Sequence, residues 1–141
     1  MPQARFSHLA LNVSSLARSE AFYLAALEPL GFVAADGEAN RYRRLTNGAD
    51  LVIVLAQVEH RFLTRPHHRK APGLHHFALS VPDKADLDAM ERHLTGLGVP
   101  LLGAGRYETG YRDGYCGLMF EDPDRITIEI AHHHPHGYYA A

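Results

Sequence analysis

Three residues of the kinds that bind divalent metal ions stand in related surroundings along this chain of 141 residues. His8 begins the stretch HLALNV, His76 begins the similar stretch HFALSV, and Glu129 lies within RITIEI. Side chains alternate between the two faces of a β-strand, so each of the three is predicted opposite the bulkier apolar residues of its strand. Two imidazoles and one carboxylate suit Fe, Mn, Zn or Ni and leave coordination positions open for a substrate. The sequence therefore predicts a divalent metal site at His8, His76 and Glu129.

A simpler interpretation exists for each of these residues taken alone. A histidine on a strand is more often a hydrogen-bonded part of the core than a ligand, and a glutamate is more often paired. The metal site is favoured because the two histidines occupy matching positions of an internal repeat. It is favoured also because an unpaired buried carboxylate is costly.

Further side chains are predicted to reach the same interior. Tyr115 would donate a hydrogen bond to a substrate oxygen at the metal, or else pack with its hydroxyl at the rim. Arg44 would hold a substrate carboxylate or phosphonate through two hydrogen bonds, unless the strand register shifts by one residue and leaves the guanidinium solvated. The stretch GRYETGYRDGYCG is predicted to form a lip over the pocket, with Tyr107, Tyr111 and Arg112 as candidate substrate contacts.

The elements that would position these residues occur twice. The predicted order is βαβββ over about residues 5–57, a linker at 58–73, and βαβββ over about 74–133, before a histidine-rich tail at 134–141. Each half alone would expose an apolar sheet face, so a single α+β domain is predicted over residues 1–141. Aligning RRLTNGADLVIVLAQ with LMFEDPDRITIEIAH places Val54 at the position of Glu129.

Local signals set the expected boundaries of these elements. Ser14 or Ser15 is predicted to cap a first helix that Pro29 and Gly31 end, and Asp83 is expected near the start of a second. The apolar stripe of the second helix is expected to comprise Leu87, Met90, His93, Leu94 and Leu97. Strands are expected at about 5–13, 32–35, 41–45, 50–57, 74–81, 99–105, 115–122 and 125–132.

Composition excludes several classes of partner. Hydrophobic residues make up 46% of the chain, and the formal net charge of −2 argues against a nucleic-acid partner. No apolar run approaches the roughly 20 residues that span a membrane, and the first residues do not resemble a secretion signal. The single cysteine, Cys116, excludes an internal disulfide. A single cysteine fits a reducing cytoplasm, so a cytoplasmic protein is expected. No phosphate-binding glycine loop is present, and no organic cofactor is expected.

The paired βαβββ units, with HLALNV, HFALSV and FEDPDRITIEI, resemble the vicinal oxygen chelate superfamily. That superfamily includes glyoxalase I, extradiol dioxygenases, fosfomycin-resistance enzymes, methylmalonyl-CoA epimerase and bleomycin-binding proteins. The resemblance covers residues 5–133 and implies a cup-shaped mixed sheet, half from each module, around a metal at His8, His76 and Glu129. It also implies a homodimer and a small-molecule substrate that chelates the metal through two adjacent oxygens.

Two positions depart from the family pattern. The fourth ligand position of the family is Val54, which cannot bind a metal, so true glyoxalase I activity is disfavoured. Met119 stands where extradiol dioxygenases and fosfomycin-type transferases have a tyrosine, so neither activity is assigned. The resemblance favours a metal-dependent dioxygenase, lyase or thiol transferase. The alternative is a metal-free small-molecule binding protein of the bleomycin-resistance type.

Overall fold

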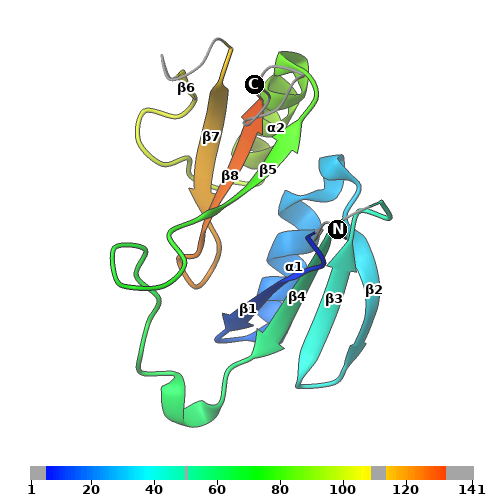
Figure 1. The fold of residues 1–141 in the computed structure, drawn as a ribbon, viewed down its shortest axis with the longest axis vertical. Coiled ribbons are helices and arrows are strands. Elements are labelled where there is room, and N and C mark those ends of the chain that lie inside the picture. Colours follow the sequence, from blue (N-terminus) through cyan, green and yellow to red (C-terminus); the bar gives the residue numbers. More distant parts are fainter. Residues whose placement is uncertain (1–5, 50, 109–113, 133–141) are drawn as a thin grey trace, which may run out of the picture. The chain divides into compact units, whose positions relative to one another are not determined.

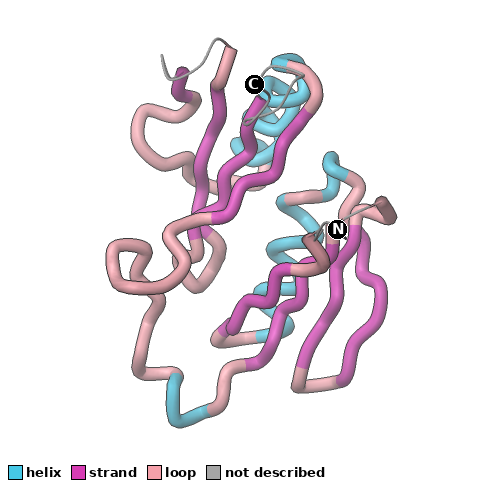
Figure 2. Tube along the Cα trace, viewed as in Figure 1, coloured by secondary structure: helices cyan, strands magenta, loops and turns pink. Residues whose placement is uncertain are grey.

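The computed structural model describes residues 6–49, 51–108 and 114–132, which form two compact units, Met1–Pro66 and His67–Ala141. Each unit contains one four-stranded sheet and one long helix (Figures 1 and 2). The predicted α+β fold of two tandem βαβββ modules is confirmed. The cup-shaped joining of the two sheets stays a prediction.

The first unit follows the predicted order of elements. Its sheet has the strand order β1-β4-β3-β2, in which β1 and β4 are parallel and the other neighbours are antiparallel. A 3₁₀ turn at Glu28–Leu30 follows the helix, and a second at His60–Phe62 lies in the predicted linker. The elements are β1 (Leu9–Val13), α1 (Leu16–Ala26), β2 (Val33–Glu38), β3 (Tyr42–Thr46) and β4 (Val52–Gln57).

The second unit repeats this topology with the strand order β5-β8-β7-β6. Strands β5 and β8 are parallel, and β7 pairs with β8 and β6 in the antiparallel sense. Among the described residues no helix is long and apolar enough to cross a membrane. The elements are β5 (Phe77–Val81), α2 (Lys84–Gly96), β6 (Tyr107–Glu108), β7 (Cys116–Glu121) and β8 (Thr127–His132).

The register of the parallel pairs shows that Val54 and Glu129 are equivalent. Ala10 lies opposite Val54 in the first sheet, and Ala78 lies opposite Glu129 in the second. Ala10 and Ala78 each stand two residues after the histidine that begins the repeated stretch. The alignment predicted from the sequence is therefore confirmed.

Equivalent turns precede the last strand of each module. The Asn47 side-chain oxygen accepts hydrogen bonds from the backbone N–H groups of Ala49 and Leu51, each at 3.1 Å. Asp122, at the same place in the second unit, accepts from two backbone N–H groups at 2.8 Å. Side-chain acceptors of this kind fix a turn by satisfying backbone donors. The strands that follow both turns thus begin at the same register.

Helix α2 covers one face of the second sheet (Figure 1). Asp83 is its N-cap, as predicted, and the Asp86 carboxylate accepts a hydrogen bond from the Asp83 N–H at 3.1 Å. Leu97 was predicted within the apolar stripe but is 46% exposed, because it lies beyond the last helical residue. The helix buries three apolar side chains, and β8 with the residue before it buries three isoleucines; they are Leu87, Met90, Leu94, Ile126, Ile128 and Ile130.

The strand predicted at 99–105 is wrong. Only Leu101 forms an isolated bridge, to Phe120, and the second-module edge strand is instead β6. Pro100 has no N–H to donate to a sheet. Gly103 and Gly105 adopt φ angles of 67° and 89°, which turn the chain away from an extended path.

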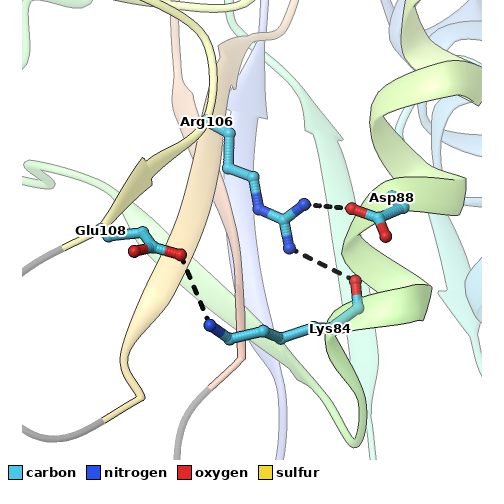
Figure 3. A network of polar contacts seen from close by, with 4 residues as sticks. All are labelled: Lys84, Asp88, Arg106 and Glu108. Atoms are coloured by element: carbon cyan, nitrogen blue, oxygen red, sulfur yellow. Dashed lines mark hydrogen bonds and ion pairs between the residues drawn. The ribbon is translucent and has the colours of Figure 1, made fainter.

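Polar contacts join β6 to the beginning of α2 (Figure 3). The Arg106 guanidinium pairs with the Asp88 carboxylate and donates to the Lys84 carbonyl at 3.4 Å. The Lys84 ammonium in turn lies 3.4 Å from the Glu108 carboxylate. These contacts flank Tyr107 on both sides in the sequence, and they hold the short strand that carries it.

Candidate functional site

Glu129 lies at the centre of the candidate site and is only 2% exposed. A glutamate is almost never buried to this degree without partners. Its Oε1 accepts hydrogen bonds from the hydroxyls of Tyr107 and Tyr115, the second at 2.5 Å. Its Oε2 lies 3.0 Å from Nε2 of His76. Both carboxylate oxygens therefore have partners: Oε1 accepts from two tyrosine hydroxyls, and Oε2 lies beside a histidine nitrogen.

Sheet register brings these side chains together. Glu129 stands opposite Ala78 on β5 and Met119 on β7. Tyr107 stands opposite Gly117, whose missing side chain leaves room for the phenol. A methyl group on Gly117 would lie 3.0 Å from the Tyr107 hydroxyl oxygen. The small residues around Glu129 thus let larger side chains reach its carboxylate.

His76 is oriented through its other ring nitrogen. Its Nδ1 lies 2.7 Å from Nδ1 of His75, and the two rings meet edge to face with centroids 5.0 Å apart. A hydrogen bond at one ring nitrogen determines what the other can do. Because Nδ1 is taken up by His75, Nε2 is the nitrogen that faces Glu129.

The Tyr107 hydroxyl is suited to donate at neutral pH. Burial raises the pKa of Tyr107, and its hydrogen bond to Glu129 raises that pKa further. Burial removes water from the phenolate, and an ionised Tyr107 would also place a second negative charge against the Glu129 carboxylate. The Tyr107 and Tyr115 rings lie 6.5 Å apart, tilted by 38°.

A cavity of about 360 Å³ opens beside this cluster. On β5 it is lined by Ala78, Leu79 and Ser80, of which only Leu79 is buried. Two alanines and a serine make part of its wall, so a ligand there would meet few bulky side chains. The lining residues are His76, Ala78, Leu79, Ser80, Tyr115, Glu129 and Ala131.

The spacing of His76 and Glu129 fits a metal ion. Two ligand atoms that are each about 2.1 Å from a metal and at right angles to one another are roughly 3.0 Å apart. The separation of Nε2 and Oε2 is 3.0 Å, which equals this spacing and is equally the length of a direct hydrogen bond between the two side chains. In the described part of the chain, no group of three or more His, Cys, Asp or Glu side chains is arranged to hold a metal. His76 and Glu129 both lie in the second unit, and their role as ligands stays a prediction.

His8 belongs to the first unit. It stands immediately before β1, is exposed, and has Nδ1 3.1 Å from the Ser7 hydroxyl oxygen. Its use of Nδ1 parallels that of His76. Its role as a ligand stays a prediction.

Arg44 has a partner within its own sheet. It stands opposite Val54, so the predicted register is correct and Arg44 is equivalent to Met119. Its guanidinium binds both oxygens of Asp36, at 3.0 and 2.8 Å, and lies 5.0 Å from the centre of the Tyr42 ring. A substrate anion would have to compete with Asp36, and the predicted contact stays a prediction.

The predicted lip is described only in part. Tyr111 and Arg112, and the tail at 134–141, lie outside the described residues. Tyr107 was predicted as a substrate contact, but sequence reasoning missed its hydrogen bond to Glu129. A glycine, Gly117, facing an aromatic residue on the neighbouring strand would be the signal for it, but this signal is visible only once β6 has been located.

The sequence model of the Glyoxalase/Bleomycin resistance protein/Dioxygenase superfamily matches residues 5–130. The chain belongs to this superfamily. The resemblance noted from the repeated histidine stretches is confirmed, and the superfamily's printed description itself spans more than one activity.

Similar proteins support the assignment to the glyoxalase/bleomycin resistance/dioxygenase superfamily. The chain is 30% identical over 128 residues to the uncharacterized protein YqjT of Bacillus subtilis (strain 168), covering 87% of this chain and 94% of that one. A crystal structure from Bacillus halodurans is 29% identical, with a TM-score of 0.81 and coverage of 93% and 97%. A glyoxylase/bleomycin resistance protein/dioxygenase domain from Frankia sp. EAN1pec is 25% identical, with a TM-score of 0.75 and coverage of 94% and 100%.

Proposed function

We propose that the chain is a metal-dependent enzyme that binds a small substrate through two adjacent oxygens at a divalent ion held by His8, His76 and Glu129. The observation that supports this proposal is the buried Glu129 carboxylate. One of its oxygens accepts from two tyrosines, and the other lies beside the Nε2 of His76. A divalent ion bound there would supply Lewis-acid polarisation of a substrate oxygen.

The surrounding side chains would hold the ligands in place. Tyr107 and Tyr115 donate to Oε1, which fixes the carboxylate plane and leaves Oε2 toward His76. His75 orients the His76 ring through Nδ1. Such outer contacts set the orientation and basicity of metal ligands. The cavity beside Ala78 and Ala131 would take the substrate.

The reaction class is narrowed by Val54. A fourth protein ligand is missing at the position equivalent to Glu129, so a glyoxalase I reaction, which needs a carboxylate to move a proton, is disfavoured. Dioxygenase, lyase or thiol-transferase chemistry is the proposed class. A redox-active ion, Fe or Mn, would support a dioxygenase, whereas Zn or Ni would support a lyase or a transferase. We also propose that the chain forms a homodimer and acts on a small-molecule substrate.

The test is elemental analysis of tag-free protein, alone and after reconstitution with Fe, Mn, Zn or Ni ions. The variants are His8→Ala, His76→Ala and Glu129→Gln, which nearly preserves shape but removes the charge. His60→Ala is the matched control, because it removes an exposed histidine from a 3₁₀ turn of the linker. We expect about one ion per chain in the wild type and in His60→Ala. The three site variants should bind at least ~10-fold more weakly.

Each outcome of the metal analysis supports or contradicts a particular part of the proposal. Unchanged binding in His8→Ala alone would remove His8 from the ligand set. Unchanged binding in His76→Ala and Glu129→Gln would remove the site altogether. A wild-type chain that takes up no ion under any condition would favour the metal-free binding protein, which would use the same cavity to sequester a ligand.

A further inference from the structure

A second pocket, of about 240 Å³, lies in the second unit and does not share any residue with the candidate metal site. Two segments that are distant in sequence form it: the end of the linker, and the end of β7 with the turn that follows. We propose that this pocket binds a small dianionic oxyanion of the phosphate type. Its lining residues are His67, His68, Arg69, Lys70, Glu121 and Arg125.

The charge of the pocket favours an anion. Arg69, Lys70 and Arg125 carry three positive charges, and Glu121 carries one negative charge, which leaves two positive charges with the histidines neutral. The Glu121 carboxylate lies 3.5 Å from Nε of Arg125, a long contact between partly exposed groups that neutralises little. The whole chain has a net charge of −2, so this concentration of cations is local.

One polar atom in the pocket wall lacks a partner. Nε2 of His67 is buried and has no hydrogen-bond partner among the residues that the structure describes. A polar atom buried without a partner is destabilising. A small rotation of the His67 ring toward an oxyanion in the adjoining pocket would give this nitrogen an acceptor when it carries the proton. His67 is therefore a further candidate donor beside the three cationic side chains.

Local hydrogen bonds hold both walls of the pocket. On the linker side, His68 Nδ1 accepts from the Lys70 N–H at 3.2 Å, and the His68 carbonyl accepts from the Ala71 N–H at 2.8 Å. On the other side, the Asp122 carbonyl accepts from the Arg125 N–H at 2.9 Å. These hydrogen bonds order the backbone that carries the cationic side chains, so a bound anion would have to order only the side chains. Arginine side chains suit phosphate oxygens through paired donors.

The experiment is calorimetric titration of the full chain with inorganic phosphate and, separately, with a phosphate monoester, at constant ionic strength and with a metal chelator present. The chelator keeps the result independent of the proposed metal site. We expect about one phosphate group per chain. Removing two charged donors in Arg69→Gln/Lys70→Gln, or one in Arg125→Gln, should weaken binding at least ~10-fold.

The matched control is Arg41→Gln/Arg61→Gln. It changes the net charge as much as the linker variant does, but at two exposed arginines that pair with Glu38 and Glu59 outside the pocket. Its phosphate affinity should equal that of the wild type. Equal weakening in the control would show general electrostatic attraction and overturn the proposal. Failure of the folded wild type to bind either compound would overturn it as well.

Discussion

Glu129 draws its partners from three separate segments of the second module. Tyr107 comes from β6, Tyr115 from the residue before β7, and His76 from the residue before β5. All three contacts end on one carboxylate, so the side chain is held in a single orientation although it is buried. A buried carboxylate needs this kind of compensation, because charge transferred from water without partners is very costly.

Alkaline stability tests the Tyr107 contact. The pKa of Tyr107 is raised in the folded chain, whereas a tyrosine in the unfolded chain ionises near pH ~10. Below this pH both states are protonated and the contact contributes its full stability. Above it the unfolded state releases a proton that the folded state keeps, so stability falls as pH rises.

In the Tyr107→Phe variant, the unfolded chain has no phenol at this position and cannot release this proton. The free energy of unfolding, measured by urea titration from about pH 9 to pH 11, should fall less steeply than in the wild type, by the equivalent of up to about one proton. The five tyrosines outside the cluster contribute equally to both proteins, so the difference reports on Tyr107 together with Tyr115, which shares Oε1 of Glu129. Parallel pH profiles in the two proteins would contradict the assignment.

At the scale of elements, the site depends on the close approach of β6 to β7. Gly117 is the residue that permits it, because a methyl group there would lie 2.9 Å from the Ile130 carbonyl oxygen and 3.0 Å from the Tyr107 hydroxyl. Such contacts force a shift of the neighbouring strands. Tyr107 would then be displaced from Glu129, which links the packing of this edge to the chemistry of the site.

Gly117→Ala should therefore destabilise the chain by about 1–3 kcal/mol in urea denaturation, as overpacking does elsewhere. Gly96→Ala is the control, since a methyl group at this helical glycine would meet no atom within 4 Å. That substitution should be neutral or stabilise the helix by up to ~1 kcal/mol. If Gly117→Ala were as stable as the wild type, the close packing of Tyr107 on this glycine would be contradicted.

At the scale of the whole molecule, the sequence predicted the strands correctly where apolar and polar residues alternate regularly. Alternation predicted the strand around Leu9–Val13 and its repeat at Phe77–Val81, and the equivalence of Val54 and Glu129 followed from one alignment. Alternation could not reveal β6, which has only two residues. The hydrogen bond between Tyr107 and Glu129 depends on that strand, so it was out of reach too.

The alternation of side chains along the strands also could not predict which charged side chains pair with one another. The register placed Arg44 on the face predicted, but nothing in the alternation identified Asp36 as its partner. Asp36 lies where the β2–β3 register shifts between Ala34 and Gly37, and such an irregularity moves side chains away from the places that a strict period of two assigns.

The proposed ligand set has a consequence for stability that involves both units. An ion bound by His8, His76 and Glu129 would be released when either unit unfolds, so it should stabilise the chain as a whole. At roughly 100 times Kd the stabilisation is about 2.7 kcal/mol. For a chain of this size it corresponds to a rise in the thermal midpoint of roughly 5–10 °C.

Thermal unfolding with and without a saturating zinc(II) or manganese(II) salt would measure this rise. His8→Ala, which removes a ligand from the first unit, should retain less than half of it, and His60→Ala should retain it all. The histidines of the tail are present in every variant, so weak binding there cancels in the comparison. A full rise in His8→Ala, together with its loss in His76→Ala, would confine the metal site to the second unit and leave Glu129 and His76 as its protein ligands.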